Sequence, residues 1–86
     1  MRIVNRSGRT IAYELRAGPL RMTMSECDLA PGEEEEWESP YRTPGQALRC
    51  VVRVSVDDEL VGEIEVGERA VVQIEQDGEQ WRIVAA

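Results

Sequence analysis

Residues 48–84, LRCVVRVSVDDELVGEIEVGERAVVQIEQDGEQWRIV, decide the fold, because apolar and polar residues alternate along almost the whole stretch. A period of two places apolar side chains on one face of a β-strand and polar side chains on the other. Turn-forming residues interrupt the alternation at Asp57-Asp58, at Gly67 and at Asp77-Gly78. The stretch therefore predicts a four-stranded antiparallel meander in the C-terminal half.

The parity of the inward positions predicts the loop lengths, because inward residues must pair with inward residues. The first two hairpins should have three-residue loops, 57–59 and 67–69, and the last a two-residue Asp77-Gly78 turn of type I′. In this register Gly62 leaves space for the indole of Trp81. The central inward row would contain Val52, Ile64, Val72 and Ile83.

The N-terminal half shows the same period with fewer apolar residues, and no segment has apolar residues at helical spacing. Ile11, Tyr13 and Leu15 should share one face of their strand. The chain is therefore predicted to be all-β, a single domain over residues 1–86 that forms a small antiparallel β-sandwich or barrel of seven or eight short strands. The expected N-terminal strands are 3–5, 10–16, 20–25 and 33–38, followed by a long loop at 39–46.

The composition excludes several classes of function. Seventeen acidic residues against ten basic ones give a net charge of −7, which repels phosphate backbones, so we expect no nucleic-acid partner. Every basic residue is arginine and there is no histidine, which removes lysine Schiff bases, histidine bases and histidine metal ligands. We therefore expect no enzymatic activity, no cofactor and no metal.

The apolar runs are far shorter than the roughly 20 residues of a membrane helix, so we expect a soluble, cytoplasmic chain without a membrane span. Cys27 and Cys50 permit one disulfide, and the lack of a leader favours free thiols. Cys50 falls on the inward face, where a thiol acts as a small core residue. Without histidine, the two cysteines make a poor zinc site.

The first candidate site is the acidic run EEEEWE at 33–38, followed by Ser39-Pro40-Tyr41. As a recognition edge, the carboxylates of Glu34 and Glu36 would attract a basic peptide or a cation. Trp37 and Tyr41 would stack on a sugar ring or hold an apolar anchor. The alternative is a charged edge strand that blocks aggregation, with Trp37 filling the core.

The second candidate site is the outward face of the predicted meander. One outward row would hold Val51, Glu65, Val71 and Val84, with Val61 close by, which is less polar than a solvated sheet face. The row indicates a protein or peptide partner, or a homo-oligomer; the alternative is the strand propensity of valine at exposed positions. The leading hypothesis is thus a non-enzymatic protein- or peptide-interaction module.

The alternative function is a lectin-like carbohydrate-binding or Ca²⁺-dependent ligand-binding sandwich. It would use Trp37, Tyr41 and the acidic turns. If the strands run up and down in order, the turns near Asp28, Asp57 and Asp77 share one end of the molecule, and converging oxygens suit Ca²⁺. Turn chemistry alone also explains aspartate at these positions.

The segments IVNRSGRTIAY at 3–13 and LAPGE at 29–33, followed by Trp37 and Pro40, resemble the start of a β-sandwich repeat. The repeat comes from the adaptor-binding region of vacuolar-sorting, bridge-like lipid-transfer proteins, and the resemblance covers about the first half of the chain. It implies peptide-adaptor binding, with Asn5 in the place of an asparagine that matters for the site. This chain has one such unit rather than an array, so the resemblance supports a binding module and no more specific function.

Overall fold

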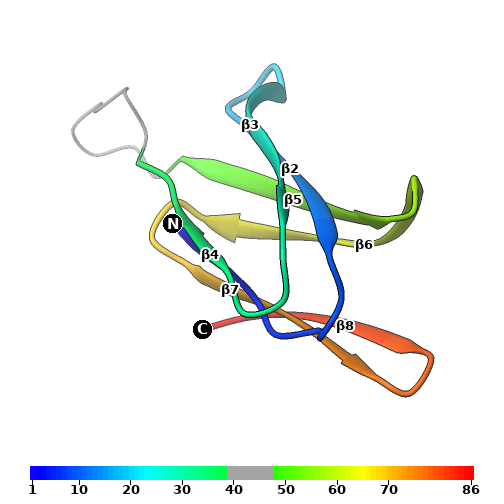
Figure 1. Cartoon of the computed structure of the whole chain (residues 1–86). Coiled ribbons are helices and arrows are strands. Elements are labelled where there is room, and N and C mark those ends of the chain that lie inside the picture. Colours follow the sequence, from blue (N-terminus) through cyan, green and yellow to red (C-terminus); the bar gives the residue numbers. More distant parts are fainter. Residues whose placement is uncertain (39–47) are drawn as a thin grey trace.

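The computed structural model describes residues 1–38 and 48–86, which form eight β-strands and no helix. The strands make two four-stranded sheets packed as a small sandwich (Figure 1), which confirms the predicted all-β fold. The described part of the chain contains no helix that could span a bilayer. The predicted loop at 39–46, including Tyr41, lies outside the described residues.

Each sheet combines strands from both halves of the chain. Sheet A has the order β4-β1-β7-β8, with β1 at Arg2–Asn5, β4 at Glu34–Glu36, β7 at Val71–Asp77 and β8 at Gln80–Ala85. Sheet B has the order β3-β2-β5-β6, with β2 at Ile11–Ala17, β3 at Met22–Leu29, β5 at Arg49–Val56 and β6 at Glu59–Gly67.

The C-terminal half does not form one four-stranded meander. The chain crosses from sheet B to sheet A after β6, so the predicted hairpin with loop 67–69 is wrong. The predicted inward row is divided accordingly: Val52 pairs with Ile64 in sheet B, while Val72 lies in sheet A. Alternation could not reveal this, because strands of two facing sheets point their apolar residues into the same core.

One strand pair is parallel, although all pairs were expected to be antiparallel. β1 lies between β4 and β7 in sheet A, and it pairs in parallel with β7, Ile3 opposite Val72. β1 and β7 lie far apart in the sequence, so no hairpin turn indicates that they pair.

The β5–β6 hairpin is tighter than predicted. Val56 pairs with Glu59 across a two-residue turn, and both turn residues, Asp57 and Asp58, have positive φ, 51° and 63°, as in a type I′ turn. The extra residue that parity requires is Val61, which forms a β-bulge instead of lengthening the loop. Beyond the bulge the predicted register is confirmed, as in the pair of Val52 and Ile64.

The β7–β8 hairpin has a two-residue turn as predicted, but the turn lies one residue later, at Gly78-Glu79. Gly78 has a φ of 64° and takes the first turn position, where type II′ turns place glycine. This shift places Ile83 opposite Ile74 and Trp81 opposite Gln76.

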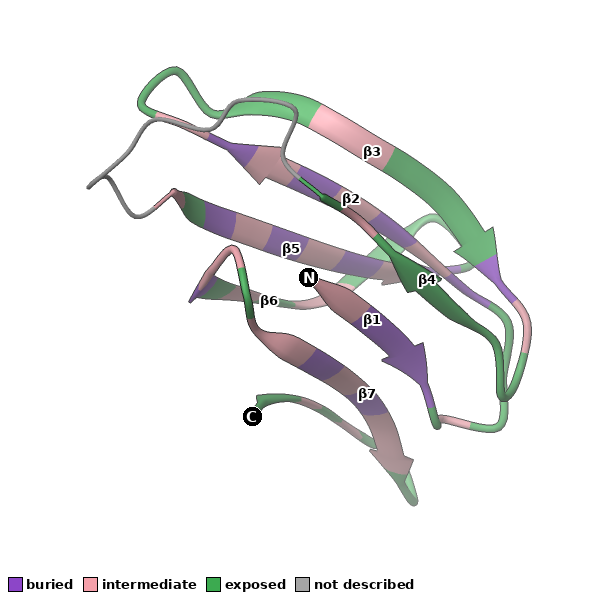
Figure 2. Cartoon of the chain, turned by 90° about the vertical axis from the view of Figure 1, so that its left-hand side faces the viewer, coloured by how far each residue is buried: buried purple, intermediate pink, exposed green. Residues whose placement is uncertain are grey.

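The core lies between the sheets and is built from alternate residues of the strands, as the bands on β2, β5 and β7 in Figure 2 show. Ile11, Tyr13 and Leu15 are buried on one face of β2, as predicted. Gly62 allows close approach of the two sheets, but the residue that occupies the space beside it is not Trp81, the residue that we predicted. A Cβ at Gly62 would lie 2.7 Å from Cδ1 of Ile83. The glycine therefore makes room for Ile83, and β6 and β8 close one side of the sandwich.

Candidate functional site

The predicted acidic recognition edge becomes β4, an exposed strand at the edge of sheet A. Glu34 and Glu36 are exposed, and Glu34 lies 3.8 Å from Nε of Arg2. Trp37 is half-buried against the core, and its carbonyl accepts a hydrogen bond from the amino group of Met1 at 2.7 Å. Trp37 thus takes the core-filling position that we gave as the alternative, and its proposed companion Tyr41 lies outside the described residues.

The four outward valines do not share a row. Val51 and Val61 belong to sheet B, whereas Val71 and Val84 belong to sheet A. Val61 forms the bulge and packs against the core. Of the predicted row only the pair of Val51 and Glu65 remains, so a continuous valine face is wrong.

A smaller apolar patch on the outer face of sheet A includes Val4, which sequence reasoning missed. Val4 is only 8% exposed, yet it lies outside the core cluster, because its neighbours Ile3 and Asn5 take the inward positions. Val4 and Val84 flank Gln73 in one row, with Val71 in the adjoining row. We name Val4, Val71 and Val84 the valine patch.

Asn5 is the only buried polar residue in the described part of the chain, with no exposed surface. Its Nδ2 group donates to the carbonyls of Arg9, Leu29 and Ala30 at 2.7, 2.9 and 3.2 Å. Its Oδ1 atom accepts from the backbone N–H and the hydroxyl of Ser7 at 3.0 and 2.7 Å. Asn5 therefore ties the β1–β2 loop to the β3–β4 connection, and no atom of its amide is free for a ligand.

One of the acidic turns contacts a positive charge. Nη2 of Arg9 lies 3.1 Å from Oδ2 of Asp57, and the guanidinium lies 5.9 Å from the centre of the Trp81 ring. This contact joins the β5–β6 turn of sheet B to β8 of sheet A. Within residues 1–38 and 48–86, no group of three or more acidic or cysteine side chains could hold a metal ion.

The free thiols of Cys27 and Cys50 lie on β3 and β5, which β2 separates. Cys50 is buried, and burial raises the pKa of its thiol. Cys27 is exposed although it lies opposite Tyr13, whose side chain faces the core. Solvent therefore reaches β3 on the inner face of the sheet as well.

Tyr13 marks the border between the core and this exposed strand. Its hydroxyl shares a 3.1 Å hydrogen bond with the hydroxyl of Ser25 on β3. Burial raises the pKa of Tyr13 to about 12, so its hydroxyl stays protonated at neutral pH. Neither Tyr13 nor Cys50 can supply an activated nucleophile.

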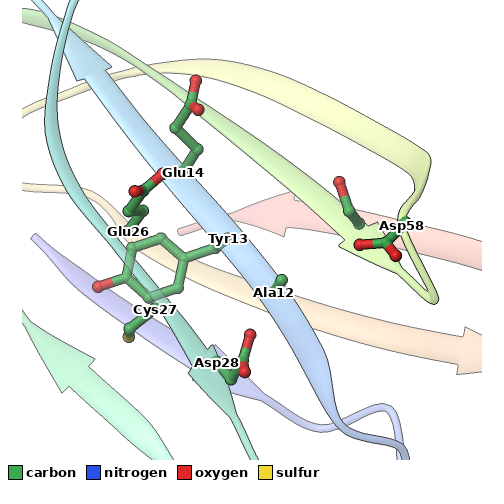
Figure 3. A pocket seen from close by; sticks show the side chains of 8 residues that line it. Ala12, Tyr13, Glu14, Glu26, Cys27, Asp28 and Asp58 are labelled. Carbon is green, nitrogen blue, oxygen red and sulfur yellow. The ribbon is translucent and has the colours of Figure 1, made fainter.

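A hollow of about 380 Å³ lies on the outer face of sheet B and extends from β3 across β2 to the β5–β6 turn (Figure 3). Its floor includes the small side chain of Ala12, which lies between Asp28 on β3 and Ser55 on β5. We name this the acidic hollow, since four carboxylates surround the floor. They belong to Glu14, Glu26, Asp28 and Asp58.

Three carboxylates of the acidic hollow have no ion pair with another described residue: those of Glu26, Asp28 and Asp58. The fourth, on Glu14, pairs with Arg16. Arg53, which lies opposite Glu14, already lies 3.4 Å from Glu63. The hollow therefore keeps a negative charge beside β3.

β3 provides the longest strand edge in the described residues that is not packed against another strand. β4 has only three residues, and β6 and β8 lie against each other. β3 has eight residues and pairs on one side only, with β2. A bulge near Met24 interrupts this pairing, which leaves a regular stretch at 25–29.

The sequence contained a signal for the acidic hollow that our predictions did not use. Glu26 and Asp28 alternate with Cys27, which places both carboxylates on one face if the strand continues. We expected this strand to end near Ser25, so we assigned Asp28 to a turn. Only the pairing of β2 with β3 places Glu14 opposite Glu26 and Ala12 opposite Asp28.

Comparison of the chain with protein-family models, with curated proteins and with solved structures found no match. The functional assignment therefore depends on the geometry of the chain itself. Because no family model matches, no function is transferred from the repeat that residues 3–13 and 29–33 resemble.

Proposed function

We propose that this protein is a non-enzymatic interaction module, which binds an extended segment of a partner protein or peptide along the free edge of β3. The length and exposure of this edge support the proposal most strongly. An edge strand offers unpaired N–H and C=O groups at alternate residues, and an extended peptide can pair with them as an added strand.

The surroundings of β3 suit an extended chain better than a compact ligand. The acidic hollow is open and carries four carboxylates among its eight lining residues, whereas small-molecule sites are concave and mostly apolar. Solvent reaches both faces of β3, through the acidic hollow on the outer side and at Cys27 on the inner side. A bound strand would therefore have room for side chains on both of its faces.

The thiol of Cys27 provides a direct test. Peptides of about ten residues, selected by phage display against the folded protein, serve as the probe. A peptide paired with β3 should slow alkylation of Cys27 by N-ethylmaleimide. Two N-methylated versions of each peptide, one methylated at odd-numbered and one at even-numbered residues, should differ in binding. Methylation should abolish binding in one version and leave it intact in the other, because only one edge of the peptide pairs with β3. Selected peptides that leave the alkylation rate unchanged and bind equally well in both methylated versions would contradict the proposal.

The valine patch is a second interaction surface, proposed for self-association. Val84 is 37% exposed and is the most accessible of the three valines, while Val4 in the same row is only 8% exposed. Light scattering over a range of concentrations, on wild type and a Val71→Lys variant, tests it. A mass that rises with concentration only in the wild type would support it, and a constant wild-type monomer mass would contradict it.

The lectin-like function stays a prediction, because Tyr41 lies outside the described residues. Binding to a glycan array with and without Ca²⁺ tests it directly.

A further inference from the structure

We infer that the segment bound along β3 is a basic peptide segment, with arginine or lysine at alternate positions, and that it is not a second copy of this chain. This inference rests on the proposed function of β3. A strand added to a sheet edge places alternate side chains on the same face as those of its neighbour. On the outer face of β3 these neighbours are Glu26 and Asp28.

The charge of the acidic hollow selects the side chains of the added strand. Glu26 lies opposite Glu14, and Asp28 lies opposite Ala12, while Arg16 on the same face of β2 is already paired with Glu14. A basic side chain from the added strand could reach Glu26 or Asp28 directly. Arginine adds the geometry for paired hydrogen bonds to a carboxylate. An acidic side chain at the same position would instead add a like charge.

The same carboxylates disfavour pairing between two copies of the chain. Antiparallel pairing of β3 with β3 of a second copy would place Glu26 and Asp28 beside the same residues of the copy, and like charges across a strand pair are destabilising. Pairing of β3 with β4 of a second copy would bring Glu34 and Glu36 to this edge. Because β6 and β8 pack against each other, they offer no comparable edge.

The two ends of β3 differ in chemistry. At the end near the β2–β3 turn, Leu20 and Met22 are 81% and 59% exposed, the two most exposed large apolar side chains in the described residues. Glu26 and Asp28 lie beyond the bulge, toward the other end of the strand. A segment that covers the whole edge should therefore place basic residues beside Glu26 and Asp28, and an apolar residue beside Met22.

Three synthetic peptides of about ten residues are suitable probes, with alternating Arg-Val, Thr-Val and Glu-Val sequences. Fluorescence anisotropy at low salt measures their affinities. The Arg-Val peptide should bind wild type at least about tenfold more tightly than the Thr-Val peptide, and the Glu-Val peptide should bind most weakly. Saturating Arg-Val peptide should slow alkylation of Cys27.

Two protein variants with the same change in net charge locate the site. Glu26→Lys with Asp28→Lys should weaken Arg-Val binding by about tenfold or more, because attraction becomes repulsion at the edge. The matched control, Glu34→Lys with Glu36→Lys on β4, should weaken it by no more than about threefold, through net charge alone. All four residues are exposed, and thermal unfolding by circular dichroism checks that both variants fold.

The outcomes separate this inference from the proposed function. If the Thr-Val and Arg-Val peptides bind with equal affinity and both slow alkylation of Cys27, strand addition at β3 stands and the basic preference is wrong. If the β4 variant loses binding and the β3 variant keeps it, the site is the acidic run at 33–38 and both proposals fail. If no peptide of any charge protects Cys27, the proposed function fails first.

Discussion

The strand edges on the two long sides of the sandwich differ in how they are protected from pairing with other chains. On one side, which we call the closed side, β6 packs against β8, with Gly62 against Ile83, so each sheet covers the edge of the other. On the other side, the open side, β3 and β4 remain exposed and carry carboxylates, including Glu26 on β3 and Glu34 on β4. Packing closes an edge to every partner, whereas charge rejects like-charged strands and leaves the edge open to basic ones.

The largest effect should come from Asn5, which holds the β3–β4 connection at the open side. Asn5→Ala should destabilise the protein by about 2 to 4 kcal/mol, because the buried carbonyl of Leu29 and the partly buried carbonyl of Ala30 lose their donor. Urea unfolding measures the change. Ser7→Ala is the control and should cost less, because Ser7 is only partly buried. A loss below about 0.5 kcal/mol for Asn5→Ala would mean that this amide does not hold the open side.

The closed side should be sensitive to added volume at Gly62. Gly62→Val should destabilise by about 1 to 3 kcal/mol, because its side chain overlaps the end of Ile83. Combining it with Ile83→Val should recover part of the loss in a double-mutant cycle, since the shorter side chain frees space. Additive losses, or a Gly62→Val variant with unchanged urea midpoint, would show that β6 and β8 do not meet as described.

The border between the core and β3 should respond to alkaline pH through Tyr13. Its pKa is raised by burial to about 12 in the folded protein, above the usual value of about 10. The folded state therefore favours the neutral phenol over the phenolate more strongly than the unfolded state does. The associated stability is fully present below about pH 10 and is lost as the pH rises toward about 12, by about 2 kcal/mol. Urea unfolding between these pH values measures the loss. Tyr13→Phe should reduce the slope, and an identical slope in wild type and Tyr13→Phe would contradict the burial of this hydroxyl.

Removal of charge from the open side should have the smallest effect on stability and a clear effect on association. Glu26→Thr with Asp28→Thr should change the free energy of unfolding by less than about 0.5 kcal/mol, because both positions are exposed. The neutral edge should then pair between copies, which raises the mass measured by light scattering above that of wild type. The corresponding change on the closed side, Glu63→Thr with Glu65→Thr, should leave the mass unchanged. Equal masses for wild type and both variants would contradict the protective role of Glu26 and Asp28.

The sequence predicted the strands better than it predicted their neighbours. Period-two alternation identified the buried face of β2 and the pairing of β5 with β6, because both follow from local pattern and a short turn. It did not show that β7 belongs to the other sheet or that β1 pairs with it in parallel. Both sheets turn their apolar faces to one core, so the pattern is the same for either arrangement.

The candidate site was harder to predict for the same reason. Ala12, Glu14, Glu26 and Asp28 form one surface only through the β2–β3 register, and the exposure of β3 depends on which strands lie beside it. The most conspicuous sequence feature, the run at 33–38, instead forms a three-residue edge strand followed by a half-buried tryptophan. Local composition indicated acidic edges, but only the sheet order shows which edge is long enough to receive a strand.

Amide hydrogen exchange across the four edge strands, with and without the Arg-Val peptide, compares the open and closed sides in one experiment. Alternate residues of 25–29 have N–H groups that point away from β2. In the free protein these groups should exchange quickly, and saturating peptide should slow their exchange by at least about tenfold. Exchange on β6 and β8 should be the same in both states. Slowed exchange on β4, β6 or β8 instead, or no slowed exchange on β3, would contradict the assignment of β3 as the binding edge.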